Sequence, residues 1–310
     1  MGSVRYREVT VKSALTRVQG MPYFSWSLNP YTGCAHSCPY CYAREYHAKR
    51  GRDTGAGFDR EVDVKINFAD VLRLELRHLH LRKTVALGTA TDPYQPIEGK
   101  YRLTRRSLEA LCLSPLPLVV VTKGSLVVRD IDLFERLSKL TSVRICLSIP
   151  SVDPEIASRA EPGAAPPRAR LEAVRRLRAA GIDAGVLAAP ILPGISDTEP
   201  SLEAVATAAV AAGATFFHHR PLKLDPGVRP HYFAMIAEHF PTLVAPTAER
   251  FVGRVNQDAR YVDELERRVE RVRARHGFFE ERQRSASASR AASRATSRPA
   301  PEPAQMRLAI

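Results

Sequence analysis

From residue 24 onward, short apolar runs alternate with longer segments whose apolar residues recur at helical spacing. Unbroken apolar runs are typical of strands covered on both faces. The segment 69–82 places Leu72, Leu76 and Leu79 on one face, as an amphipathic helix does. The pattern predicts strands at 24–28, 62–68, 84–88, 118–121, 143–149, 182–188 and 214–220. It predicts helices at 41–50, 69–82, 104–113 (with Thr104 as N-cap), 131–140, 168–180 and 200–212.

Alternating strands and helices indicate an α/β fold with a parallel sheet and right-handed crossovers. The best fit is a partial barrel of about six βα units, a partial (β/α)6 barrel, and the alternative is a doubly wound open sheet. In both folds ligands bind at the carboxyl ends of the strands.

Four regions are expected along the chain. An irregular lead-in covers residues 1–22, and the barrel covers 23–222. A C-terminal helical extension covers 223–280, with helices at 226–240 and 248–279. The tail, 281–310, consists mainly of Ser, Ala, Arg and Pro, and this composition predicts disorder because it cannot bury a core.

Charge and cysteine content narrow the function classes. The formal net charge is +13, which favours a polyanionic partner such as nucleic acid, although an arginine-rich composition can also reflect codon bias. Opposite charges are mixed within 260–275, which indicates a solvated helix face rather than a nucleic-acid helix. Five cysteines, three of them close together, do not form a disulfide framework and suit a reducing compartment. No secretory signal and no apolar run of about 18 residues is found, so we expect a cytoplasmic protein without membrane contact.

Three cysteines follow the first predicted strand in the spacing C-x3-C-x2-C: Cys34, Cys38 and Cys41. On so short a loop three thiolates can converge on one metal centre, and Gly33 and Pro39 suit a tight curl. A [4Fe–4S] cluster held by three cysteines keeps one iron open for another ligand. The alternatives are a zinc site completed by His36 or His47, and a chance grouping of buried cysteines.

Polar residues follow several of the other predicted strands, where the fold would bring them to one rim. They are Thr91-Asp92, Thr122-Lys123, Ser148, the segment 190–194 and His218-His219-Arg220. The histidines and Arg220 could bind a substrate or phosphate, but buried structural histidines are more common than ligand-binding ones.

The cysteine loop, with Tyr40 just before the third cysteine, resembles the cluster loop of the radical SAM superfamily. Together with the runs 91–96, 121–123 and 147–149, the run 29–42 is similar to the spore photoproduct lyase-related branch of that family. The resemblance covers about residues 24–222. It implies that Cys34, Cys38 and Cys41 bind a [4Fe–4S] cluster whose open iron chelates S-adenosylmethionine (SAM). Reductive cleavage of SAM would then give a 5′-deoxyadenosyl radical that abstracts a hydrogen atom from a substrate.

The same resemblance implies contacts to SAM. Lys123 would bind the carboxylate of SAM, and Ser148 its ribose or methionine part. Thr91 and Asp92 would lie where the family meets the amino group. The resemblance places Ile191, in the small apolar stretch 191–194, against the adenine. Tyr40 and Tyr42 flank the cluster and could contact the adenine as well. The alternatives are a surface lysine at Lys123, a strand-end cap at Ser148 and a turn-forming Asp92.

One departure from the lyase pattern concerns the hydrogen donor. Photoproduct lyases carry a donor cysteine in the segment that matches residues 88–92, and this chain has none there. Cys112 and Cys146 lie within a predicted helix and strand, as small buried residues. The resemblance therefore implies radical chemistry, an electron donor such as flavodoxin or ferredoxin, and a possible nucleic-acid substrate, without fixing a dipyrimidine-lyase reaction. The alternative function is a zinc-stabilised nucleic-acid-binding protein without catalysis.

Overall fold

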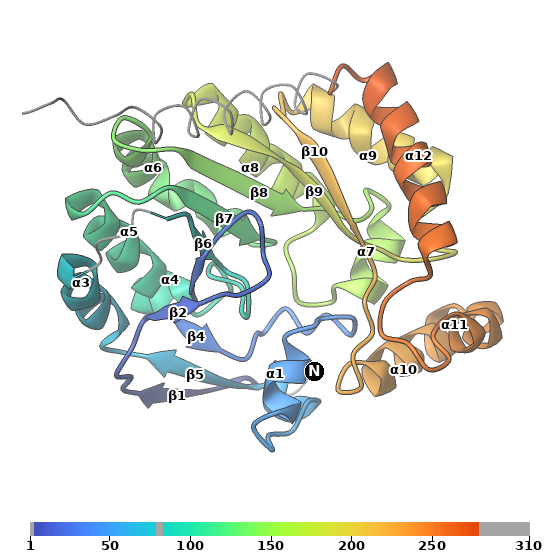
Figure 1. The fold of residues 1–310 in the computed structure, drawn as a ribbon, viewed down its shortest axis with the longest axis horizontal. Coiled ribbons are helices and arrows are strands. Elements are labelled where there is room, and N and C mark those ends of the chain that lie inside the picture. The colour runs from blue at the N-terminus through green and yellow to red at the C-terminus, as the bar shows by residue number, and fades with distance from the viewer. Residues whose placement is uncertain (1–2, 79–82, 279–310) are drawn as a thin grey trace, which may run out of the picture.

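The computed structural model describes residues 3–78 and 83–278. Within this part of the chain, the larger sheet has seven strands in the order β10-β9-β8-β7-β6-β3-β2, and a smaller sheet has three in the order β1-β5-β4 (Figure 1). The strands of the larger sheet are β2 Leu15–Arg17, β3 Trp26–Leu28, β6 Val85–Leu87, β7 Leu118–Thr122, β8 Val143–Ser148, β9 Asp183–Ile191 and β10 Phe217–Pro221. The strands of the smaller sheet are β1 Arg5–Val9, β4 Tyr31–Thr32 and β5 Glu61–Lys65.

The larger sheet is the expected partial barrel. From β3 to β10 each strand pairs in parallel with the next, and β2 adds an antiparallel edge strand. The strand order follows the sequence order without reversal, whereas a doubly wound sheet reverses at a switch point. The doubly wound alternative is therefore wrong. All carboxyl ends of the parallel strands lie at one rim.

Helices cover the outer side of this sheet (Figure 1). Those that follow the parallel strands through β9 are α3 Phe68–His78, α5 Leu103–Leu113, α6 Ile131–Ser138, α8 Pro167–Ala179 and α9 Glu199–Ala211. Shorter elements are α1 Arg44–Ala48, α2 Ala56–Asp59, α4 Glu98–Tyr101, α7 Pro154–Ala160 and the 3-10 segments η1 Ser125–Asp130 and η2 Pro241–Leu243. Leu108, Phe134 and Leu177 are buried members of the main core beneath these helices.

Two expectations about the first 70 residues are wrong. The lead-in is not irregular, because residues 5–9 and 15–17 form β1 and β2. The predicted strand at 62–68 exists as β5, but it pairs with β1 and β4 outside the barrel. Its buried valines, Val62 and Val64, pack with Tyr31 and Leu103 in a core of their own. An apolar run alone cannot tell which sheet a strand joins.

Thr104 is not the N-cap that the sequence suggests. Arg102 caps α5 with a left-handed backbone, and Thr104 lies inside the helix. The Thr104 hydroxyl donates a 2.6 Å hydrogen bond to the carbonyl of Pro93. This bond ties α5 to the turn that follows β6.

The C-terminal extension contains α10 Arg229–His239, α11 Val244–Arg250 and α12 Ala259–Arg275. The predicted continuous helix at 248–279 is broken, and the break contains Gly253 at a φ of 63°. Leu265 and Val269 of α12 belong to the main core, and Phe278 stacks on Phe217 of β10. Helix α12 therefore covers β10 and completes the sixth βα unit. The predicted tail, 281–310, lies outside the described residues.

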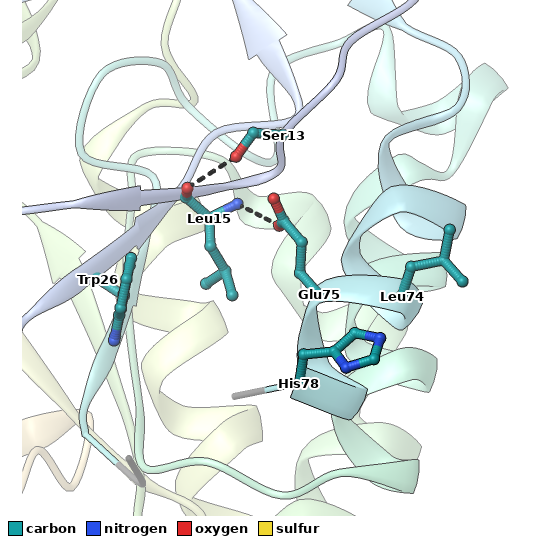
Figure 2. A pocket seen from close by; sticks show the side chains of 6 residues that line it. All are labelled: Ser13, Leu15, Trp26, Leu74, Glu75 and His78. Carbon is teal, nitrogen blue, oxygen red and sulfur yellow. Dashed lines mark hydrogen bonds between the residues drawn. The ribbon is translucent and has the colours of Figure 1, made fainter. Parts of the chain in front are cut away.

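A cavity of about 460 Å³ lies between the β2–β3 edge and α3, away from the cysteine loop (Figure 2). Its lining residues are Ser13, Leu15, Trp26, Leu74, Glu75 and His78. Glu75 accepts the backbone N–H of Leu15 at 2.8 Å and of Ala14 at 3.1 Å, which fixes the edge strand to α3. No residue expected to bind a cofactor lines this cavity. Within residues 3–78 and 83–278, no helix has the length and apolarity needed to span a membrane.

Candidate functional site

The cysteine loop connects β4 to α1 at the carboxyl rim of the barrel. Gly33 opens it with a φ of 86°, and a Cβ there would lie 2.9 Å from the carbonyl oxygens of Phe58 and Glu61. The N–H of Cys34 donates to the same Phe58 carbonyl at 3.0 Å. Only glycine suits this backbone, so the curl expected at Gly33 is confirmed.

All five cysteines lie in the described residues, and none forms a disulfide. Cys34 and Cys38 are buried and Cys41 is partly exposed. Burial raises the pKa of each of these three thiols, that of Cys38 to about 12. A site of this kind stabilises thiolates only when a metal centre supplies positive charge. Three disulfide-free thiols on one loop are a donor set that suits an iron–sulfur cluster.

Arg44 of α1 holds the middle of this loop in place by binding the backbone at Cys38. Its guanidinium is fully buried and donates from Nε and Nη2 to the carbonyl of Cys38 at 3.2 and 3.1 Å. The same group pairs with Asp59 at 2.7 Å and lies 4.8 Å from the ring centroid of Phe58. The cation is therefore satisfied within the protein and serves the loop's geometry.

Thr91 and Gln95, which follow β6, hold the start of the loop. The Thr91 hydroxyl donates to the carbonyl of Gly33 at 2.6 Å. Gln95 accepts the N–H of Ala35 at 3.0 Å and donates to the Thr91 hydroxyl at 3.0 Å. Both side chains are buried, so the segment 91–95 and the cysteine loop form one packed unit.

Asp92 connects this unit to β7. One carboxylate oxygen accepts the Thr122 hydroxyl at 2.6 Å and the N–H of Tyr94 at 2.9 Å. The other accepts the backbone N–H of Lys123 at 2.7 Å and lies 3.3 Å from Nδ1 of His36. Burial alone would raise the pKa of Asp92, but His36 and these hydrogen bonds lower it to about 2. Asp92 is thus a buried carboxylate that links β6 to β7, and both of its oxygens already have polar partners within the protein.

Lys123 and Tyr40 meet at a second carboxylate. The Lys123 ammonium lies 3.7 Å from Glu161 and 5.6 Å from the centroid of the Tyr40 ring. The Tyr40 hydroxyl donates a short hydrogen bond to the same oxygen of Glu161. Burial would lower the pKa of Lys123, but the charges of Glu161 and Cys38 outweigh it and raise that pKa. Lys123 is therefore a cation close to the cysteine loop.

Ser148 and Ile191 end the next two strands. The Ser148 hydroxyl donates to the carbonyl of Ala189 at 2.8 Å, which joins β8 to β9. Ile191 is completely buried in the main core. The structure thus joins the cysteine loop directly to Thr91, Asp92 and Lys123. The Ser148 carbonyl accepts a hydrogen bond from Arg170 of α8 at 2.7 Å, and Arg170 reaches the loop through Glu161 and Tyr40.

Sequence reasoning missed three residues of this rim: Gln95, Glu161 and Arg170. Gln95 lies in the run 91–96 that carries the family resemblance, but nothing in the sequence indicates that its side chain binds the cysteine loop. Glu161 and Arg170 lie on either side of a Pro-rich connection between α7 and α8. Their partners are distant in sequence, so no local pattern could have found them.

The histidines offered for a zinc site have other contacts. His36 faces Asp92, and the ring of His47 packs edge-on against Phe58 with centroids 5.0 Å apart. In the part of the chain that the structure describes, no group of three or more His, Cys, Asp or Glu side chains could hold a single metal ion. His219 is also removed from the rim, because it lies on the outer side of β10, 3.3 Å from Glu266 of α12.

Comparison with known families bears on whether the three cysteines hold a [4Fe–4S] cluster, hold zinc or are a chance grouping. The family model described as "Radical SAM superfamily" matches residues 28–203, which include the cysteine loop and most of the barrel. The chain belongs to the radical SAM superfamily. Members of this superfamily use a [4Fe–4S] cluster and SAM, and these are the protein's cofactors. The chance-grouping alternative for the cysteines is therefore not retained.

The chain is also similar to individual proteins and to solved structures. An uncharacterized protein of Mycobacterium tuberculosis is 39% identical over 252 residues, covering 80% of this chain and 74% of its own. A radical SAM Nalpha-GlyT isomerase of Pseudomonas phage M6 is 26% identical over 178 residues, covering 56% of this chain and 35% of its own. A spore photoproduct lyase mutant with bound AdoMet and dinucleoside spore photoproduct has a TM-score of 0.68 at 16% identity, covering 87% of this chain and 79% of its own. At that identity the likeness is one of fold.

Gly163 offers a direct test of how tightly the rim is packed on the cysteine loop. Its N–H donates to the carbonyl of His36 at 3.0 Å, and a Cβ would lie 2.2 Å from the carbonyl oxygen of Ala35. We expect Gly163→Ala to lower the free energy of unfolding by about 1–3 kcal/mol, because the two backbones must separate. The measurement is chemical denaturation under anaerobic conditions.

The matched control is Gly99→Ala in α4, where an added Cβ meets no atom within 4 Å. We expect Gly99→Ala to change the free energy of unfolding by less than about 1 kcal/mol, in the stabilising direction. Equal effects of the two variants would contradict the close contact between residue 163 and the cysteine loop.

Proposed function

We propose that the protein is a radical SAM enzyme that cleaves SAM reductively and uses the resulting radical for hydrogen abstraction. The observation that carries this proposal is a loop with three disulfide-free thiols, two buried and one partly exposed, held at the barrel rim beside the cation of Lys123. Cys34, Cys38 and Cys41 would hold the cluster. When bound, the cluster supplies one electron to SAM, which yields methionine and a 5′-deoxyadenosyl radical.

The protein's own residues would bind and orient SAM. Lys123 would meet the carboxylate of SAM, and Ser148 would contact the ribose or methionine part. Ile191 and Tyr40 would pack against the adenine of SAM. Thr91 and Asp92 already use their side-chain oxygens within the protein. We therefore propose that these two residues act at the amino-group end by fixing the loop rather than by binding SAM directly.

Nucleic acid is the proposed substrate class. The formal net charge of +13 supports it, and so does the fold shared with a lyase whose structure contains a dinucleoside photoproduct. Arg271 and Arg275 of helix α12 pair with Glu199 of α9 at 2.8 and 2.6 Å, so these two arginines are less available to a polyanion. Residues 88–92 contain no cysteine, so the proposal does not extend to photoproduct cleavage. The reductant would be a flavodoxin or ferredoxin.

The cysteine assignment predicts the behaviour of single variants. After anaerobic reconstitution, Cys34→Ala, Cys38→Ala and Cys41→Ala should each lose the brown cluster absorbance and form no 5′-deoxyadenosine from SAM and dithionite. Cys112→Ala is the matched control, because Cys112 is a buried cysteine in α5 away from the loop. It should retain iron and SAM cleavage. Colourless wild-type protein with one zinc per chain would contradict the proposal.

The nucleic-acid proposal predicts salt-dependent binding. The dissociation constant for a duplex oligonucleotide should rise at least about tenfold between ~50 and ~200 mM salt, because binding releases counterions. Adding UV-treated duplex to the reduced enzyme should increase 5′-deoxyadenosine formation above the rate without DNA. This substrate class would be contradicted if the duplex does not bind at low salt and neither untreated nor UV-treated DNA changes the rate of 5′-deoxyadenosine formation. The proposal of SAM cleavage would stand in that case.

A further inference from the structure

Glu161 is a buried carboxylate surrounded by groups from three separate parts of the rim. Its side chain is completely buried. One oxygen receives the hydroxyl of Tyr40 from the cysteine loop and lies 3.7 Å from the ammonium of Lys123, which follows β7. The other oxygen lies 2.5 Å from the guanidinium of Arg170 in α8. Glu161 therefore links the cysteine loop, β7 and α8.

Arg170 fixes the position of Glu161. Its guanidinium is buried and donates to the carbonyl of Ala165 at 2.6 Å and to the carbonyl of Ser148 at 2.7 Å. The contacts with Ala165, Ser148 and Glu161 leave this planar group little freedom. Because Arg170 is fixed, the Glu161 carboxylate that pairs with it is held in place as well.

The charges that meet at Glu161 are unequal in number. Two cations, Lys123 and Arg170, face one carboxylate, so Glu161 alone does not neutralise both. Arg170 is buried and committed to carbonyl groups, whereas the Lys123 side chain is 17% exposed. An incoming anion can therefore meet one of these two cations only at Lys123. A lysine has a long flexible stem, so a fixed ammonium position requires partners such as Glu161 and the Tyr40 ring.

We propose that Glu161 is a positioning residue that holds the Lys123 ammonium in place for the carboxylate of SAM. This inference rests on the proposed function, in which Lys123 binds that carboxylate. Glu161 touches neither SAM nor the cluster. It acts on SAM binding through Lys123, and Arg170 acts by holding Glu161.

The test is Glu161→Gln in the full chain, reconstituted anaerobically and reduced with dithionite. Glutamine keeps an oxygen for the Tyr40 hydroxyl, but the ammonium of Lys123 loses its anionic partner. SAM is titrated by its effect on the electron paramagnetic resonance spectrum of the cluster. The SAM concentration at half-saturation should rise about tenfold, while iron content stays at the wild-type value. Half-saturation within about twofold of wild type would overturn the proposal.

A double-mutant cycle separates this role from general destabilisation. Lys123→Ala should also raise half-saturation, and the double variant of Glu161→Gln and Lys123→Ala should bind SAM no more weakly than Lys123→Ala alone. Additive losses would overturn the proposal, because Glu161 would then act independently of Lys123. If Lys123→Ala leaves SAM binding unchanged, the proposed function's assignment of Lys123 fails, and the inference fails with it. The control is Glu155→Gln in α7, an exposed carboxylate paired with Arg159, which should match wild type.

Glu161→Gln leaves Arg170 as a buried cation without a counter-charge, which can destabilise the fold. A second variant, Glu161→Gln with Arg170→Met, removes that unpaired charge and carries the same expected rise in half-saturation. Unfolding curves and iron content are measured for both. Loss of folding in both variants would overturn the proposal, because Glu161 would then be needed for the fold itself.

Discussion

Two buried carboxylates hold the cysteine loop against the carboxyl ends of the parallel strands. Asp92 faces His36 and binds the backbone of Lys123, so it joins the first half of the loop to β6 and β7. Glu161 receives the hydroxyl of Tyr40 and joins the second half to α8 through Arg170. The cysteine loop between β4 and α1 contains no strand or helix, so its shape depends on these contacts.

The energetics of these carboxylates depend on complete pairing. A buried charge is costly unless cations and hydrogen bonds surround it, and losing one partner leaves the other uncompensated. Asp92 has four polar neighbours, and burial is outweighed so fully that its pKa falls to about 2. Glu161 has two cations and a hydroxyl. Glu161 alone therefore does not neutralise both cations, and the more exposed of them, Lys123, suits an anionic group of a ligand.

The sequence predicted the barrel well because each βα unit is a local pattern. The strands at 84–88, 118–121 and 143–149 and the helices between them lie within a few residues of β6, β7, β8, α5 and α6. Long-range pairing was not predictable. The strand at 62–68 carries the same apolar signal as a barrel strand, yet it pairs with β1. Helix α12 joins the barrel core, although the sequence placed it in a C-terminal extension outside the barrel.

At the site too, the sequence indicated residues that belong to local patterns but not the contacts between distant segments. Spacing alone singled out Cys34, Cys38 and Cys41 as candidate cluster ligands. Strand-end polarity predicted that Thr91, Asp92, Lys123 and Ser148 lie at the rim. Spacing could not reveal that Asp92 is already saturated, nor that Glu161 and Arg170 reach Lys123 from a different connection. Such roles follow from the tertiary packing of segments that are up to 121 residues apart, as Tyr40 and Glu161 are.

The central claim is that three cysteines of this loop hold a cluster with one iron open to SAM. The most direct measurement is electron–nuclear double resonance on the reduced, reconstituted full chain with SAM labelled by ¹³C at its carboxylate and ¹⁵N at its amino group. The account predicts hyperfine coupling of both labels to the cluster. A four-ligand cluster with no coupling to either label at saturating SAM would contradict it.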